Sequence, residues 1–175
     1  HAGLTGQASI AAWASGTLFA MSGTIVQVSI SRGGVPKLPV LEAEIGEQGV
    51  AGDRQRDLRN HGGPERAVCL YASERIAALR AEGHPIAPGT TGENITTAGI
   101  DWDQVKAGVR LRLGADVLLE VTRPTSPCTN IAGSFAKGDF VRISEKVNPG
   151  WSRVYARVIT GGTVRPGDTI ALEDA

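Results

Sequence analysis

The side chain with the clearest chemical potential in this sequence is the thiol of Cys128. It lies in residues 123–130 (RPTSPCTN), directly after a strongly apolar run, and two prolines precede it. Proline restricts its own φ and the conformation of the residue before it, so the loop is expected to present the thiol in a defined direction. If Thr129 begins a short helix, the amide donors at its start would lower the pKa of this thiol. Such a thiolate is a nucleophile or a soft metal ligand; the alternative is a small buried residue in a tight loop.

The second cysteine, Cys69, has a different setting. It lies inside residues 67–71 (AVCLY), with apolar neighbours on both sides, and is expected to be an inert core residue. Two cysteines are too few for a disulfide-rich secreted scaffold or for a zinc site of four thiolates. The sequence leaves open whether Cys69 and Cys128 form a single disulfide.

A polar loop, residues 49–66, comes directly before the AVCLY segment. Its main basic side chains are Arg54, Arg56, Arg59, Arg66 and His61, gathered around a Gly-Gly-Pro turn. Guanidinium groups bind phosphate and carboxylate in a bidentate manner, so the loop predicts a site for an anionic or strongly hydrogen-bonding ligand. The alternative is a solvated loop whose Asp and Glu side chains neutralise the arginines. His61 alone is as often a structural group as a catalyst.

A third candidate, residues 89–97 (GTTGENITT), places Glu93 and Asn94 before an apolar residue. If buried, these two side chains would be hydrogen-bonding partners for a heterocycle; if exposed, they would form only a turn. The glycine spacing matches neither a Walker loop nor a GxGxxG fingerprint, which argues against a nucleotide ligand. No GxSxG nucleophile elbow is present. The three histidines show no paired ligand spacing, so zinc is not expected.

These segments need a scaffold, and the sequence predicts one made mainly of strands. Short β-branched apolar runs alternate with Gly, Pro and Asp turns. Strands are expected at residues 24–30, 40–45, 67–71, 109–113, 117–122, 154–159 and 169–172. Of these, residues 40–45 are the weakest candidate. Gly114, Ala115 and Asp116 predict a tight hairpin between two of the strands.

Convincing helical periodicity occurs once, at about residues 73–82. Ser73 is expected to cap this helix, and its apolar stripe would contain Ile76, Leu79 and Ala77. The segment after Cys128 predicts a second, shorter helix. Because regular helices do not separate the strands, the predicted fold is mostly β: a single closed or nearly closed β-barrel with one or two short helices.

Composition sets further bounds. The chain has 175 residues, 41% hydrophobic and 21% charged, with 23 glycines, a length that fits one globular domain. Eighteen basic residues balance eighteen acidic ones, and the mean hydropathy is −0.06. A neutral chain has no global field to attract nucleic acid or an anionic membrane, so neither partner is expected.

The first twenty residues contain no Lys, Arg, Asp or Glu, and Met21 is the only methionine. We expect residues 1–20 to be sequence upstream of the natural start or added to it, and residues 21–175 to form the functional domain; a genuine N-terminal extension is the alternative. The segment lacks the basic start of a signal peptide and is too polar to span a bilayer. The expected compartment is the cytoplasm.

Five segments, taken in order, resemble the MOSC domain, which is named after the C-terminal part of molybdenum cofactor sulfurase. They are residues 37–40 (KLPV), 52–55 (GDRQ), 61–68 (HGGPERAV), 92–95 (GENI) and 126–128 (SPC). The resemblance covers roughly residues 22–172 and is strongest to small standalone members of the family.

The resemblance implies a mostly β barrel that carries a molybdenum–pterin cofactor (molybdopterin) and reduces N-hydroxylated bases or other N-oxygenated compounds. Cys128 would be the catalytic cysteine and the metal ligand. The residues that would lie near the pterin are Lys37, Arg54, His61, Arg66 and Asn94, with Arg123 and Thr125 as weaker candidates. A thiolate suits a soft metal, and a phosphate tail requires Lys and Arg.

The sequence also departs from the family pattern. Relatives often have Arg where Thr125 stands and an aromatic or basic residue where Thr129 stands. Either change could alter substrate access or phosphate binding. The chain ends at Ala175 without the C-terminal helical region of some longer relatives, which leaves a role for an external electron-transfer partner.

Three functions follow from these observations. The first is a molybdenum-dependent oxidoreductase acting on a small N-oxygenated substrate. The second is a cofactor or sulfur carrier in which Cys128 accepts a persulfide or binds the cofactor transiently. The third is a degenerate ligand-binding barrel in which the cysteine has no role.

Overall fold

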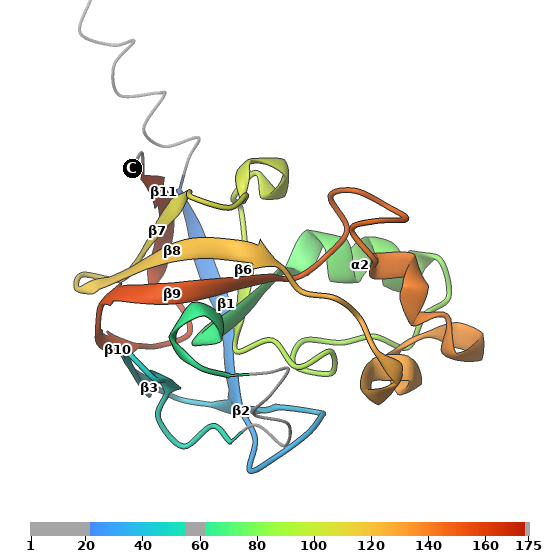
Figure 1. Ribbon diagram of the computed structural model, residues 1–175, viewed down its shortest axis with the longest axis horizontal. Coiled ribbons are helices and arrows are strands. Elements are labelled where there is room, and N and C mark those ends of the chain that lie inside the picture. The colour runs from blue at the N-terminus through green and yellow to red at the C-terminus, as the bar shows by residue number, and fades with distance from the viewer. Residues whose placement is uncertain (1–21, 55–61, 174–175) are drawn as a thin grey trace, which may run out of the picture.

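Seven strands of one sheet close into a barrel in the computed structural model, which describes residues 22–54 and 62–173 (Figure 1). The barrel order is β11-β7-β8-β9-β5-β6-β1, and pairing between β1 and β11 closes the ring. Strand β2 extends the sheet from β1. The pairing of β5 with β6 is parallel, whereas the other pairings given for this sheet are antiparallel.

The strands are β1 (Ser22–Ile30), β2 (Leu38–Val40), β3 (Ala43–Gly46), β4 (Gly49–Val50), β5 (Val68–Ala72), β6 (Ile95–Ala98), β7 (Arg110–Leu113), β8 (Val117–Pro124), β9 (Val154–Thr160), β10 (Gly162–Val164) and β11 (Thr169–Glu173). Strands β10, β3 and β4 form a separate small sheet. The α-helix is α2 (Ser73–Ala81), and the 3-10 helices are η1 (Pro64–Arg66), η2 (Trp102–Gln104), η3 (Thr129–Ser134), η4 (Ala136–Gly138) and η5 (Phe140–Ile143).

Strand patterning explains the core. In β7, Leu111 and Leu113 are fully buried while the alternating Arg110 and Arg112 are partly exposed, the pattern expected of a sheet with one wet face. In contrast, every residue of β5 is buried, and Ile76 and Leu79 of α2 belong to the same hydrophobic core as this strand. The predicted fold class, a closed β-barrel with short helices, is therefore confirmed.

Three local predictions require correction. The expected strand 40–45 is split into β2 and β3, with Leu41 between them 90% exposed. Helix α2 has Ala72 at its N-cap position, so the predicted capping role of Ser73 is wrong: its hydroxyl donates to the neighbouring Glu74 carboxylate. Ile76 and Leu79 are buried as predicted, but Ala77, which was also expected on the apolar stripe, is exposed.

The segment after Cys128 is helical as predicted, but in the tighter 3-10 form. Figure 1 shows η3–η5 (orange) on the same side of the barrel as α2 (green). The Arg142 guanidinium binds both carboxylate oxygens of Glu82, at the end of α2, over 2.7 and 2.9 Å. Among the described residues, no helix is long and apolar enough to cross a membrane.

Candidate functional site

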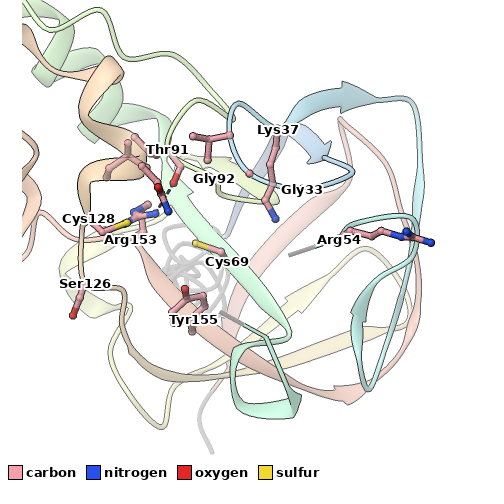
Figure 2. Close-up of a pocket in the computed structure, with 14 residues that line it drawn as sticks. Gly33, Lys37, Arg54, Cys69, Thr91, Gly92, Ser126, Cys128, Arg153 and Tyr155 are labelled. Atoms are coloured by element: carbon pink, nitrogen blue, oxygen red, sulfur yellow. Dashed lines mark hydrogen bonds between the residues drawn. The ribbon is translucent and has the colours of Figure 1, made fainter. Parts of the chain in front are cut away.

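A cavity of about 250 Å³ lies where three connecting segments meet the barrel wall (Figure 2). The β1–β2 connection contributes Lys37, the segment before β6 contributes Thr91, and the loop between β8 and η3 contributes Cys128. The barrel wall adds Cys69 from β5 and Tyr155 from β9. Residues far apart in the sequence therefore border one space.

Cys128 occupies the N-cap position of η3 and is partly exposed. Its carbonyl accepts a hydrogen bond from the Ile131 amide, which fixes the start of the helix. Before Cys128, the Thr125 amide donates to the Arg153 carbonyl over 2.8 Å. This hydrogen bond fixes the start of the proline loop to the segment just before β9. The structure thus provides the defined placement of the thiol that the two prolines predicted.

Cys69 borders the same cavity, but it is buried whereas Cys128 is partly exposed. Both cysteines are free, so the disulfide that the sequence left open is not formed. Cys69 is only 5% exposed, and burial raises the pKa of its thiol, an effect that the positive charge of Arg153 partly offsets. Its sulfur lies 3.9 Å from the Thr125 hydroxyl. Cys69 is buried, as predicted, but it also faces the candidate site.

Lys37 is a buried cation with a dedicated counter-charge. Its ammonium lies 2.5 Å from the carboxylate of Asp53, and the two side chains are 8% and 4% exposed. The Ser31 amide donates to the other oxygen of Asp53 over 2.8 Å. The charge of Lys37 is thus neutralised within the protein, and among residues 22–54 and 62–173 its ammonium donates only to Asp53, which leaves two of its three donors for a ligand.

Asn94 lies behind the cavity wall. Its side-chain oxygen accepts from the Cys69 amide, and its amide group donates to the Ser29 carbonyl and to Asp53, over 3.1, 3.2 and 3.0 Å. These contacts link β5, β1 and the Lys37–Asp53 pair. They give Asn94 a positioning role, and its predicted contact with a cofactor stays a prediction.

Arg153 is a site residue that sequence reasoning missed, as is Tyr155. It precedes β9, is 6% exposed and borders the cavity. One guanidinium nitrogen donates to the Thr91 carbonyl over 2.5 Å, as Figure 2 shows. Its Nε has no hydrogen-bond partner in the described part of the chain. The period of two that places Arg153 and Tyr155 on one face of a strand was the available signal.

The buried carboxyl group of Glu93 supports this wall. It accepts from the Gly89 amide over 2.5 Å and from the Thr91 hydroxyl over 2.6 Å. Burial raises the pKa of Glu93, while those hydrogen bonds and the charge of Arg153 lower it in part. Glu93 therefore holds in place the loop that gives Arg153 its carbonyl partner.

The other predicted residues lie around the cavity in different ways. Arg54 borders it and a second cavity of about 310 Å³, and its guanidinium points away from the two cysteines in Figure 2. The guanidinium carbon of Arg66 lies over the ring of Tyr155, 6.0 Å from its centroid. Arg123 is exposed, beside Tyr155 in the β8–β9 ladder. His61 lies outside the described residues.

A large part of this chain matches a known protein family. The model of the MOSC domain matches residues 57–171. The chain belongs to the MOSC domain family. This match spans the described part of the GGP turn, the GEN segment and the SPC loop, three of the segments that carried the resemblance in the sequence.

Three relatives of this MOSC chain illustrate the range of the similarity. YflK of Bacillus subtilis is 33% identical over 141 residues, 79% of this chain and 62% of YflK. A Gibberella moniliformis protein named reductase is 35% identical over 129 residues, 71% of this chain and 22% of that protein. YiiM of Escherichia coli is 32% identical over 116 residues, 63% of this chain and 51% of YiiM. The matched regions thus cover less than two thirds of each relative.

Solved structures share the fold. The crystal structure of YiiM from Geobacillus stearothermophilus superposes with a TM-score of 0.67 at 26% identity, covering 87% of this chain and 75% of that one. YiiM from Escherichia coli gives a TM-score of 0.66 at 26% identity, with 87% and 70% covered. The MOSC barrel described above is therefore the fold of these proteins as well.

Proposed function

We propose that this MOSC protein is an oxidoreductase that holds a molybdenum–pterin cofactor and reduces N-hydroxylated or other N-oxygenated compounds. The observation that carries the proposal is the meeting of a partly exposed, free thiol, Cys128, with buried cations at one cavity. Support for the reaction class comes from the relative named reductase, which is 35% identical to the matched part of this chain.

The side chains that border the cavity have the chemical groups that such a cofactor requires. A thiolate is a suitable ligand for a soft metal centre, and Lys37 and Arg153 supply the positive charge that a phosphate-bearing pterin requires. A cavity of about 250 Å³ is slightly smaller than the usual range for organic ligands, about 300–1,000 Å³. Arg54 also borders the adjacent cavity of about 310 Å³, which would extend the room for a ligand.

The roles of the protein groups follow from their contacts. When bound, the molybdenum centre would supply the two-electron chemistry that removes oxygen from an N–O bond. Cys128 would hold the metal from the loop that the Thr125 amide anchors to the next segment. Lys37 would direct its free donors to the cofactor, because Asp53 already fixes its ammonium group.

Tyr155 would act as a proton-bearing group in the wall. Burial raises the pKa of its phenol well above the ordinary value of 10.0. The hydroxyl group therefore keeps its proton at neutral pH and remains a hydrogen-bond donor. An external electron donor would restore the reduced state, and the cytoplasm remains the proposed compartment.

The test is to purify the protein from a cofactor-producing host, measure molybdenum and pterin per chain, and assay reduction of an N-hydroxylated amidine with a chemical electron donor. Wild type should carry near-stoichiometric cofactor and be active. Cys128→Ala should lose the metal and at least about 100-fold in rate, while the matched control Cys69→Ala should keep both. Retention of metal and activity by Cys128→Ala would contradict the assignment.

A second candidate function rests on the exposure of Cys128. A thiol that is free and reachable from a cavity can accept a persulfide or hold a cofactor transiently before transfer. This carrier function predicts a purified protein without molybdenum in which a donor persulfide transfers its outer sulfur to the thiolate of Cys128 and leaves as a thiol, with no such transfer to Cys69. Mass spectrometry of the two cysteine peptides distinguishes it from the oxidoreductase.

A further inference from the structure

The cavity is bordered by a second thiol that the proposed reaction does not use. Cys69 and Cys128 are both free, and both border this one space. Figure 2 shows their sulfur atoms pointing toward one another, Cys69 from β5 and Cys128 from the loop before η3. Two thiols that share a cavity can form a disulfide when one of them is oxidised.

The chain that joins the surroundings of the two sulfurs is short. The sulfur of Cys69 lies 3.9 Å from the hydroxyl oxygen of Thr125, a residue of the same loop as Cys128. Three extended residues span at most about 11 Å, which limits the distance between the Cα atoms of Thr125 and Cys128. A disulfide requires Cα atoms about 4.4–6.8 Å apart, which a shift of this short loop toward β5 can provide.

The two cysteines are held with different firmness. The Cys69 amide donates to the Asn94 side chain over 3.1 Å, and the Cys69 carbonyl accepts from the Asn94 amide over 2.8 Å. The Cys128 side chain makes no capping hydrogen bond to η3, and a 3-10 helix has poorer hydrogen-bond geometry than an α-helix. We therefore expect Cys69 to stay in place while the start of η3 moves.

Access from solvent sets the order in which the thiols react. Cys128 is partly exposed, whereas Cys69 is 5% exposed, so an oxidant from solution reaches Cys128 first. Burial raises the pKa of Cys69, but the positive charge of Arg153 favours its thiolate and offsets part of that effect. The attack of Cys69 on Cys128 is also intramolecular, which gives it a high effective concentration.

We propose that Cys69 is the resolving thiol of a reversible disulfide with Cys128, formed when a hydroperoxide oxidises Cys128. First, the Cys128 thiolate attacks one peroxide oxygen; the O–O bond breaks, the other oxygen leaves as hydroxide, and the sulfur becomes a sulfenic acid. The Cys69 thiolate then attacks that sulfur; the S–S bond forms, the S–O bond breaks, and the oxygen leaves as hydroxide, which takes up a proton to give water. A dithiol reduces the bond by exchange.

The disulfide has two consequences for the cavity. It keeps Cys128 from the sulfinic and sulfonic acids, whose formation is essentially irreversible. It also removes the thiolate that would bind the metal, so oxidised protein would be closed to the cofactor. This second consequence rests on the proposed function, whereas the bond itself does not.

The primary experiment treats reduced, cofactor-free protein with a stoichiometric amount of hydrogen peroxide at low protein concentration. Mass spectrometry without reduction then maps the cysteine peptides. Wild type should lose both free thiols and yield a cross-linked Cys69–Cys128 peptide, and dithiothreitol should restore both thiols.

Each cysteine variant tests one step. Cys69→Ala cannot resolve the sulfenic acid, so dimedone should trap it on Cys128, and sulfinic acid should accumulate at least about tenfold above wild type. In Cys128→Ala, Cys69 should stay reduced at the same dose of peroxide, because the oxidant does not reach it. The wild-type cross-link needs no variant, so the test stands even where a variant fails to fold.

Two results would overturn the inference. One is sulfenic or sulfinic acid on Cys128 of wild type while Cys69 stays reduced. The other is a disulfide that joins Cys128 of two chains in place of the bond within one chain.

A separate measurement distinguishes this inference from the proposed function. Reduced and oxidised protein are each mixed with released molybdenum cofactor, and the oxidised form should take up less than about one tenth of the metal, because a bound thiolate is required. If the cross-link forms but neither form binds molybdenum, the proposed function fails and the disulfide stands. If reduced protein binds molybdenum but no cross-link forms, the disulfide fails and the proposed function stands.

Discussion

Cys69 and Cys128 border the same cavity, yet the elements that hold them give their thiols different properties. Cys69 belongs to β5, a strand buried along its whole length, and burial raises its pKa. Cys128 belongs to the loop between β8 and η3, where its side chain is partly exposed. The comparison teaches that a barrel strand holds a thiol protonated and protected, whereas a loop at the barrel end leaves it free to react.

The largest expected effect is on alkylation. In native cofactor-free protein, iodoacetamide should modify Cys128 at least about 1,000-fold faster than Cys69, because exposure of a core strand requires opening events that cost several kcal/mol. Mass spectrometry of peptides from timed samples measures both rates. The two cysteines should react at similar rates in denaturant. Comparable native rates would mean that the cavity gives equal access to both sulfurs.

A second variant tests the polar network behind Cys69. Asp53→Ala leaves Lys37 without its counter-ion and removes an acceptor from Asn94, which holds the Cys69 amide. Breaking a buried ion pair from one side costs about 3–5 kcal/mol, so denaturant unfolding should show a loss of about 3 kcal/mol. Alkylation of Cys69 should accelerate while that of Cys128 stays unchanged.

The control for that variant is Glu42→Ala, which removes an exposed partner of Arg165. Exposed pairs contribute about 0–1 kcal/mol, so its stability should stay close to that of wild type. Equal losses of unfolding free energy in the two variants would show that the buried Lys37–Asp53 pair contributes no more than an exposed pair.

The smallest expected effect is on alkaline stability. Cys69 has a folded-state pKa above its ordinary value of 9.0, so above about pH 9 the unfolded chain releases a proton that the folded state retains. The free energy of unfolding therefore falls as the pH rises, by up to about 1.4 kcal/mol per pH unit for this group. Cys69→Ser should show a shallower fall between pH 9 and 10. An identical slope would exclude a contribution from Cys69, whereas Cys128→Ser serves as the thiol control.

The sequence was most informative where local patterns decide structure. The strand at β7, the Gly114 hairpin and the burial of Ile76 and Leu79 in α2 depend on near neighbours, and the structure confirms each. The helical start after Cys128 is local as well. The capping role of Ser73 failed because the preceding strand ends directly at the helix and leaves Ala72 in the cap position.

The sequence was least informative about long-range pairing. Asp53 and Lys37 are 16 residues apart, and Arg153 and Thr91 are 62 apart, so only the closed barrel brings them together. A strand buried on both faces, such as β5, gives no periodic signal for which face borders a cavity. For that reason the placement of Cys69 beside the cavity could not be predicted, while the burial of Arg153 depends on its long-range contact with Thr91.

The most direct test of the central claim is the number of sulfur ligands around bound molybdenum, measured by X-ray absorption on protein from a cofactor-producing host. Cys128→Ser should lose one sulfur from the metal shell relative to wild type, and Cys69→Ser should lose none. An unchanged shell in Cys128→Ser, or a sulfur lost in Cys69→Ser, would contradict the account.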